Sequence, residues 1–146
     1  MPLILVGADT PTGDAILAKV EPRPREIRVF VTDERRGVEL KRRGFKVATG
    51  DVSDESHIEA AALRCFSAVL IAEAAHDNRE RAFASSAAQV MNGWARAIAD
   101  SGVTRVIWVT GDDHPETAAP EVTSVDPSRQ GFVEEIIALD DAQSIS

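Results

Sequence analysis

Near its N-terminus the chain passes from four apolar residues into a glycine turn, in the segment 3–13 with the sequence LILVGADTPTG. Gly7 opens the turn, and Gly13 begins an amphipathic segment that extends to Val20. A buried strand that turns in this way into a helix aims free backbone N–H groups at one point, where a diphosphate can bind. The pattern therefore predicts the first strand, turn and helix of a dinucleotide-binding α/β sheet.

Apolar runs rich in Val and Ile recur along the chain, at 3–6, 27–31, 45–49, 68–72 and 105–110. They are nearly continuous, as expected of strands that are covered on both faces of a parallel sheet. Helical patterns lie between them, at 13–20, 35–43, 54–66 and about 79–101. The alternation predicts an α/β fold: a doubly wound, Rossmann-like parallel sheet of five strands in the order 3-2-1-4-5, in three α/β/α layers.

The long helix expected at about 79–101 has an apolar face whose members follow three- and four-residue spacings: Phe83, Ala87, Val90, Met91, Trp94, Ala97 and Ile98. Three prolines and scattered acids predict a long loop over 111–130, and 131–142 is expected to form a terminal helix. A chain of 146 residues, 44% of them hydrophobic, is expected to make a single domain over 1–146.

The net charge of -8 is unevenly distributed, because residues 51–146 hold six basic and seventeen acidic side chains. This acidity argues against a nucleic-acid or membrane partner. Cys65, the one cysteine, lies among apolar neighbours and is expected to be a buried structural thiol, which suits a reducing compartment. The apolar start from Met1 to Val6 is too short for a signal peptide, so a cytoplasmic location is expected.

The segment 7–13 resembles the Gly-x-x-Gly-x-x-Gly turn of the short-chain dehydrogenase/reductase superfamily, in particular its atypical, NmrA-like branch of NAD(P)-binding Rossmann proteins. Three later segments are similar to that branch in order and spacing: GDVSD at 50–54, FSAVLI at 66–71 and SGVTRVIWVT at 101–110. The four landmarks extend over about residues 3–111. The resemblance implies the family's Rossmann fold, with a dinucleotide as ligand.

The turn departs from the family pattern at its middle glycine, which is Thr10 here and is followed by Pro11. The Thr10 side chain can crowd the diphosphate, or its hydroxyl can donate a hydrogen bond to it. The dinucleotide site is expected to be retained. In the alternative, Gly7 and Gly13 serve only the turn and the packing of helix on strand.

The superfamily's catalytic pair, Tyr-x-x-x-Lys, is absent, since the sequence has no tyrosine and no lysine after Lys46. Thr110 stands where the family often places a catalytic serine, but an isolated hydroxyl without a base is interpreted as a hydrogen bonder at the strand end. No catalytic residue is therefore assigned. Only about 35 residues follow Gly111, so the family's sixth strand and substrate-binding segment are expected to be missing.

Selection between NAD and NADP depends on the end of the second strand. A carboxylate such as Asp33 hydrogen-bonds ribose hydroxyls and repels a 2′-phosphate, whereas Arg35 and Arg36 attract one. Thr32 stands where NADP-binding relatives of the branch often carry an arginine. The basic second helix gives a slight preference for NADP over NAD, although a solvated helix face explains its charges equally well.

The resemblance also implies that Asp51 and Val52 lie beside the adenine, and that Ala72 and Glu73 lie over the ribose. Glu73 is unusual there, because a carboxylate near the diphosphate opposes anion binding. The candidate cofactor-binding residues are Gly7, Asp9, Thr10, Pro11, Thr12, Gly13, Thr32, Asp33, Arg35, Arg36, Asp51, Val52, Ala72, Glu73 and Thr110.

Other polar and aromatic residues receive weaker assignments. Asp112 and Asp113 follow a strand's carboxyl end and can line a ligand site, but with His114 they lack a second ligand set, so no metal site is expected. Trp94 and Trp108 fit core positions on a helix and a strand.

Three functions remain open. The chain is expected to be a non-catalytic NAD(P)-binding module that reports redox state through a regulatory protein partner. One alternative is a small NADPH-dependent reductase whose hydride transfer needs no tyrosine. The other is a nucleotide-free structural shell that acts through protein contacts. A homodimer is also considered, through an exposed edge of the fifth strand and the terminal helix.

Overall fold

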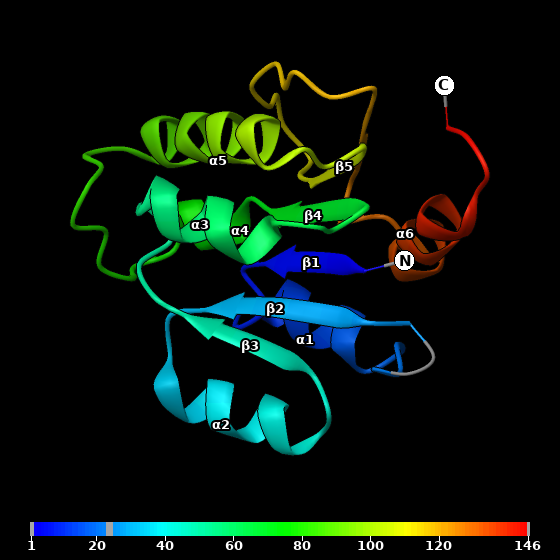
Figure 1. Ribbon diagram of the computed structural model, residues 1–146, viewed down its shortest axis with the longest axis horizontal. Coiled ribbons are helices and arrows are strands. Elements are labelled where there is room, and N and C mark those ends of the chain that lie inside the picture. The colour runs from blue at the N-terminus through cyan, green and yellow to red at the C-terminus, as the bar shows by residue number, and fades with distance from the viewer. Residues whose placement is uncertain (1, 23–24, 146) are drawn as a thin grey trace.

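The computed structural model describes residues 2–22 and 25–145; Met1, with which the apolar start begins, lies outside them. Within these ranges, six parallel strands form one sheet in the order β3-β2-β1-β4-β5-β6 (Figure 1). The strands are β1 (Leu3–Val6), β2 (Ile27–Val31), β3 (Lys46–Thr49), β4 (Ser67–Ile71), β5 (Arg105–Val109) and β6 (Glu121–Val125). The Rossmann-like α/β fold predicted from the sequence is confirmed.

Helices cover both faces of the sheet: α1 (Pro11–Leu17), α2 (Glu34–Arg42), α3 (Glu55–Ala62), α4 (Glu73–His76), α5 (Ala87–Ser101) and α6 (Phe132–Asp141). Apolar residues of α3, α4 and α5 pack on one face of the sheet, and those of α1, α2 and α6 pack on the other. In the ranges that the structure describes, none of these helices combines the length and apolarity of a membrane span.

Two glycines allow close packing around the first turn, Gly7 against α4 and Gly13 of α1 against the turn itself. Gly7 has a φ of +88°, and a Cβ there would lie 2.8 Å from the Cβ of Ala74. A Cβ on Gly13 would lie 2.4 Å from the carbonyl oxygen of Ala8. Both positions therefore require glycine, for a left-handed backbone in one case and for close packing of helix on strand in the other.

A sixth strand lies within the segment expected to be a long loop. Glu121–Val125 forms β6, which pairs in parallel with β5. Its residues alternate between partly buried and exposed as far as Val125, so a search for continuous apolar runs does not find it. Because β6 covers the edge of β5, the prediction of a five-stranded sheet with an exposed fifth edge is wrong, and so is that of a loop over the whole of 111–130.

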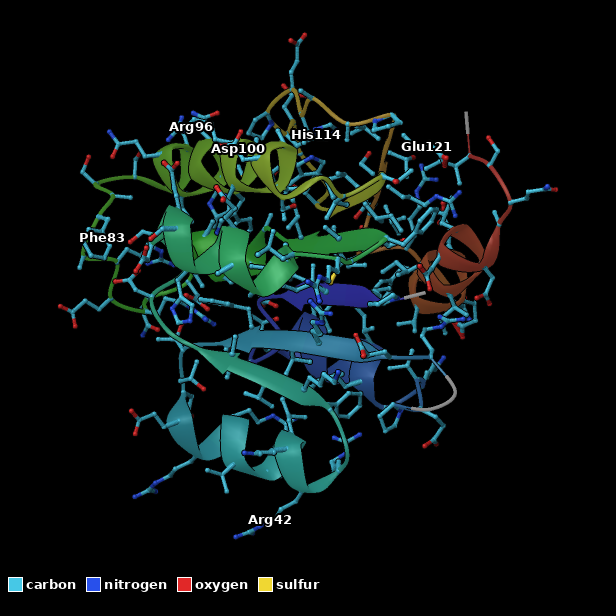
Figure 2. All side chains as sticks on the ribbon, viewed as in Figure 1. Arg42, Phe83, Arg96, Asp100, His114 and Glu121 are labelled. Atoms are coloured by element: carbon cyan, nitrogen blue, oxygen red, sulfur yellow. The ribbon has the colours of Figure 1, made fainter. Side chains whose placement is uncertain are left out.

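The helix predicted at about 79–101 begins only at Ala87. Ser86 caps it, because its hydroxyl accepts a hydrogen bond from the amide of Gln89 at 3.2 Å. Residues 77–86 before it form neither helix nor strand. Phe83, which the spacing placed on the buried face of the helix, lies on this segment with 70% of its surface exposed (Figure 2). The N-cap at Ser86 falls within the apolar pattern, so the first part of the predicted helix is irregular and only the second part is helical.

The two tryptophans and the cysteine that the sequence assigned to the core are buried as expected. Trp94 and Trp108 are 1% and 0% exposed, and their rings stack with centroids 6.4 Å apart. Cys65 is buried as well, and burial raises the pKa of its thiol, with Glu26 adding to the rise and Arg28 opposing it. A thiol that stays protonated is a poor nucleophile, which fits a packing role.

Candidate functional site

The hydroxyl of Thr10 is used inside the glycine turn. Thr10 is the N-cap of α1 and is only 1% exposed. Its Oγ1 donates to the carbonyl oxygen of Gly7 at 2.7 Å and accepts from the amide of Gly13 at 2.9 Å. In this arrangement the side chain stabilises the turn and neither projects over it nor offers a proton to a ligand.

Glu73 reaches the same turn from the beginning of α4. Its Oε1 accepts a hydrogen bond from the amide of Thr12 at 3.0 Å. Pro11, the preceding residue, has no N–H to offer, and the amide of Gly13 is held by Thr10. The carboxylate that the sequence placed near a diphosphate therefore binds one of the amides that such a diphosphate would use.

Asp9 joins the carboxyl ends of β1 and β2. Its Oδ2 accepts hydrogen bonds from the amides of Thr32 at 2.8 Å and Asp33 at 3.0 Å, and its side chain is only 6% exposed. The carboxylate of Asp33 instead caps α2, where it accepts hydrogen bonds from the amides of Arg35 and Arg36. Asp9, and not Asp33, is thus the carboxylate directed into the sheet edge at this point.

The two arginines considered as 2′-phosphate ligands do not converge. The guanidinium of Arg36 forms ion pairs with Asp14 at 2.6 Å and Glu39 at 2.5 Å. Arg35 lies exposed on the first turn of α2. Neither is held against the end of β2 in the described structure.

Arg79, instead of Arg35 or Arg36, is the arginine that lies against the end of β2. Its Nη1 donates to Oδ1 of Asp9 at 2.8 Å and to Oγ1 of Thr32 at 3.1 Å. The same guanidinium pairs with Asp77 at 2.8 Å, and its side chain is 11% exposed. Burial alone disfavours the charged form of Arg79, but the hydrogen bonds that it donates to Asp77 and Asp9 outweigh burial and raise the pKa of Arg79.

Asp51 lies at the end of β3 and binds the segment 77–86. Its Oδ1 accepts hydrogen bonds from the amide and hydroxyl of Ser53, and its Oδ2 accepts one from the amide of Ala82 at 2.7 Å. The hydroxyl of Ser53 in turn accepts from the amide of Phe83 at 3.0 Å. Burial opposes ionisation of Asp51, but these hydrogen bonds and the charge of Arg81 lower its pKa.

Next to Asp51, the backbone is fixed by the core. Val52 is 1% exposed, and its carbonyl oxygen accepts a hydrogen bond from Nε1 of Trp94 at 2.8 Å. The indole of Trp94 therefore helps to fix the backbone just after β3.

The remaining candidates lie at the ends of β4 and β5. The amide of Ala72 donates to the carbonyl oxygen of Val109 at 3.1 Å. Thr110 is 9% exposed, and its hydroxyl accepts a hydrogen bond from the amide of Asp112 at 3.1 Å. Asp112 and Asp113 are exposed. Thr110 is thus a hydrogen bonder just beyond a strand, as the sequence suggested.

Three charged residues of this edge were missed from the sequence: Asp77, Arg79 and Arg81. The long helix expected at about 79–101 included both arginines and gave them no role at the site. Two signals oppose that interpretation. The run DNRER at 77–81 has no apolar residue, and two serines at 85 and 86 provide a new N-cap.

With this geometry described, comparison with known proteins defines the family. The chain matches the TrkA-N domain over residues 3–105. It belongs to the TrkA-N domain family. This is a family of Rossmann-type NAD(P)-binding domains, which confirms that part of the prediction from sequence. No curated protein sequence matches the chain.

Several solved structures share the fold. ChuY, an anaerobillin reductase from Escherichia coli O157:H7, superposes with a TM-score of 0.58 and 21% identity over 75% of this chain and 50% of its own. Citrobacter sp. triphenylmethane reductase, complexed with NADP(H), gives 0.59 and 16% over 75% and 37%. Escherichia coli quinone oxidoreductase QOR2, complexed with NADPH, gives 0.57 and 17% over 74% and 36%. The chain thus spans half or less of these relatives.

Internal contacts already engage the polar groups around the glycine turn and at the neighbouring strand ends of this TrkA-N domain. Gly7 and Gly13 keep the turn close to the sheet. The amide of Thr12 is bound by Glu73, and the ends of β2 and β3 are bound by residues of 77–86.

Proposed function

We propose that this TrkA-N domain binds NAD(P) and carries out no redox chemistry of its own, so that it acts as a regulatory module for a protein partner. One observation carries the proposal: the glycine turn keeps its geometry, while the tyrosine that related oxidoreductases use as proton donor is absent from the 146 residues. A ligand site without a proton donor is suited to binding and not to turnover.

The end of β5 offers no substitute for that donor. Thr110 accepts a hydrogen bond from a backbone amide, and its hydroxyl contacts no basic side chain within 2–22 and 25–145. A threonine without a base is a weak proton donor and a weak nucleophile. This supports the non-catalytic assignment.

A small NADPH-dependent reductase is the second candidate. The similar solved structures include reductases complexed with NADP(H) or NADPH. Hydride transfer from a bound nicotinamide does not by itself need a tyrosine, because the cofactor carries the chemistry and the protein orients it. At 16% and 17% identity, however, the likeness extends to the fold alone.

Calorimetric titration with NAD⁺, NADH, NADP⁺ and NADPH tests the proposal, together with nicotinamide absorbance in the presence of quinone or flavin acceptors. The expected result is binding of at least one dinucleotide without its consumption. Consumption of NADPH that persists in Thr110→Val would support the reductase instead. If no dinucleotide binds, the domain is a structural shell.

Between the two cofactors, we propose NAD as the better ligand. The carboxylate of Asp9 sits on the amides of Thr32 and Asp33, where a 2′-phosphate would approach. Charges of the same sign repel, so the Asp9 carboxylate disfavours a 2′-phosphate at this strand end once Arg79 no longer pairs with it. This repulsion outweighs the slight preference for NADP drawn from the basic second helix, whose Arg36 is engaged elsewhere.

Asp9→Asn tests this choice. The amide side chain keeps the size of Asp9 and removes its charge, so the ratio of NADP⁺ to NAD⁺ affinity should rise about tenfold. The ratio, measured by titration, separates specificity from any general change in affinity. An unchanged ratio would contradict the assignment of Asp9.

A further inference from the structure

The segment 77–86, called the strap below, crosses the edge of the sheet where dinucleotides bind in Rossmann folds. It connects α4 to α5 and is the green loop beside the arrowheads of β1 and β2 in Figure 1. Ligands of such sheets bind outside the carboxyl ends of the strands. The strap therefore lies at the proposed cofactor site of the chain.

Its first anchor is at the ends of β1 and β2. Arg79 donates from Nη1 to Asp9 at 2.8 Å and to the hydroxyl of Thr32 at 3.1 Å, with its side chain 11% exposed. Asp77 holds the other side of the guanidinium at 2.8 Å, and Arg81 also pairs with Asp77, at 2.9 Å. These contacts fill the place where the second strand of the fold meets the ribose of a dinucleotide.

Its second anchor is at the end of β3. The amide of Ala82 donates to Asp51 at 2.7 Å, and the amide of Phe83 donates to the hydroxyl of Ser53 at 3.0 Å. Burial raises the pKa of Asp51, but its hydrogen bonds and the charge of Arg81 have the larger effect, and the net shift is downward. This anchor therefore holds an ionised carboxylate. The strap thus covers the neighbouring strand end as well.

Glu73 acts just ahead of the strap, at the glycine turn. Its carboxylate accepts a hydrogen bond from the amide of Thr12 at 3.0 Å. In a dinucleotide complex, an oxygen of the diphosphate would accept that hydrogen bond instead. Glu73 begins α4, and the strap begins directly after that helix ends at His76. One continuous stretch, 73–86, therefore contacts the turn and the ends of β1, β2 and β3.

We propose that residues 73–86 are an internal occupant of the dinucleotide cleft, and that bound NAD(P) displaces Glu73 from Thr12 and releases the strap. This inference rests on the proposed function. It makes the domain a switch with two states, one closed by its own carboxylate and strap and the other holding the ligand. Binding energy that goes into opening is lost from affinity, so the closed state weakens the observed binding.

The test uses a matched pair of variants of the full chain. Glu73→Gln removes the charge that competes for the amide of Thr12. Glu135→Gln removes the same charge from α6, away from the strap, at a side chain that is exposed and makes no hydrogen bond or ion pair in the described structure. Each protein is titrated calorimetrically with NAD⁺, NADH, NADP⁺ and NADPH.

Glu73→Gln is expected to bind its preferred dinucleotide about fivefold to tenfold more tightly than wild type, because a neutral acceptor is a weaker competitor than a charged one. Glu135→Gln should bind as wild type does. Binding by wild type with no gain in Glu73→Gln, or an equal gain in both variants, overturns the internal occupant and leaves the proposed function intact. If neither wild type nor Glu73→Gln binds any of the four dinucleotides, both the internal occupant and the proposed function are overturned.

Discussion

Two arginines, Arg105 buried and Arg79 partly buried, lie at opposite ends of this sheet, and the contrast separates what maintains the fold from what closes the site. Arg105 begins β5 and has no exposed surface. It pairs with Glu121 of β6 at 2.6 Å and donates to three carbonyl oxygens at the end of α6, those of Leu139, Asp140 and Ala142. This network fixes the edge strand and the terminal helix to the amino end of the sheet.

Arg79 makes a similar network at the carboxyl end, with a different result. Its partners are carboxylates, Asp9 at 2.8 Å and Asp77 at 2.8 Å, and it comes from a segment without secondary structure. Ligands of parallel sheets bind at the carboxyl ends of strands. The same kind of interaction thus stabilises architecture at one end and an openable strap at the other.

Arg105→Met should cause the largest loss of stability. It leaves Glu121 and the carbonyl oxygens of α6 without their donor, and breaking a buried charge network by removing one partner costs about 3–5 kcal/mol. Urea denaturation measures this loss. Arg129→Met, at an exposed position, is the control. Equal midpoints for the two variants would contradict the role of Arg105.

Arg79→Met should destabilise less, by about 1–2 kcal/mol, because both carboxylates keep other donors. Asp9 retains the amides of Thr32 and Asp33, and Asp77 retains Arg81. Hydrogen exchange should accelerate in 77–86 while the sheet stays protected. A uniform acceleration across the chain would mean that Arg79 supports the fold and not the strap alone.

Acidification should weaken the strap. Burial alone raises the pKa of Asp77, but the hydrogen bonds and charge of Arg79, together with the charge of Arg81, have the larger effect. The net result is a lowered pKa for Asp77. A carboxyl with a folded pKa below its unfolded value, about 3.9, stabilises above that value and loses this contribution as pH falls toward the folded pKa. The stability difference between wild type and Asp77→Asn, measured in urea, should therefore shrink as pH falls below about 4. A difference independent of pH would contradict this linkage.

The smallest effect is expected at Arg96. It pairs with Glu55, but its side chain is 61% exposed. The hydrogen bond to Glu55 and the charge of Glu55 raise the pKa of Arg96, and burial opposes them only weakly. Exposed pairs are screened by water and salt and add little stability. Arg96→Gln should melt within error of wild type in thermal denaturation. A clear drop in the midpoint would show that the contact between α3 and α5 depends on this pair.

The contrast also explains which parts of the fold the sequence could predict. Strands that are buried on both faces are continuous apolar runs, so β1 and β2 were predicted with their observed bounds. β6 has a polar, alternating pattern at the sheet edge and was missed. Its attachment through Arg105 depends on residues that lie far apart in the sequence, and local periodicity carries no information about such pairs.

The site divides in the same way. Gly7 and Asp51 follow strands that the apolar runs define, and Gly13 lies in the first turn of the helix after β1, so their shared edge followed from the predicted topology. The contact of Glu73 with Thr12 joins residues that are 61 positions apart, and only its unfavourable charge could be foreseen. Arg79 was hidden inside a helical pattern, because charged residues on a predicted helix are normally assigned to solvent.

Hydrogen exchange of residues 77–86, with and without saturating NAD(P), tests the account most directly. The amides of Ala82 and Phe83 are held by Asp51 and Ser53 in the closed state. The account predicts that the dinucleotide speeds their exchange while it slows exchange around the turn at Gly7–Gly13. Slower exchange of the strap in the bound protein would contradict it, since the strap would then close over the ligand and not leave.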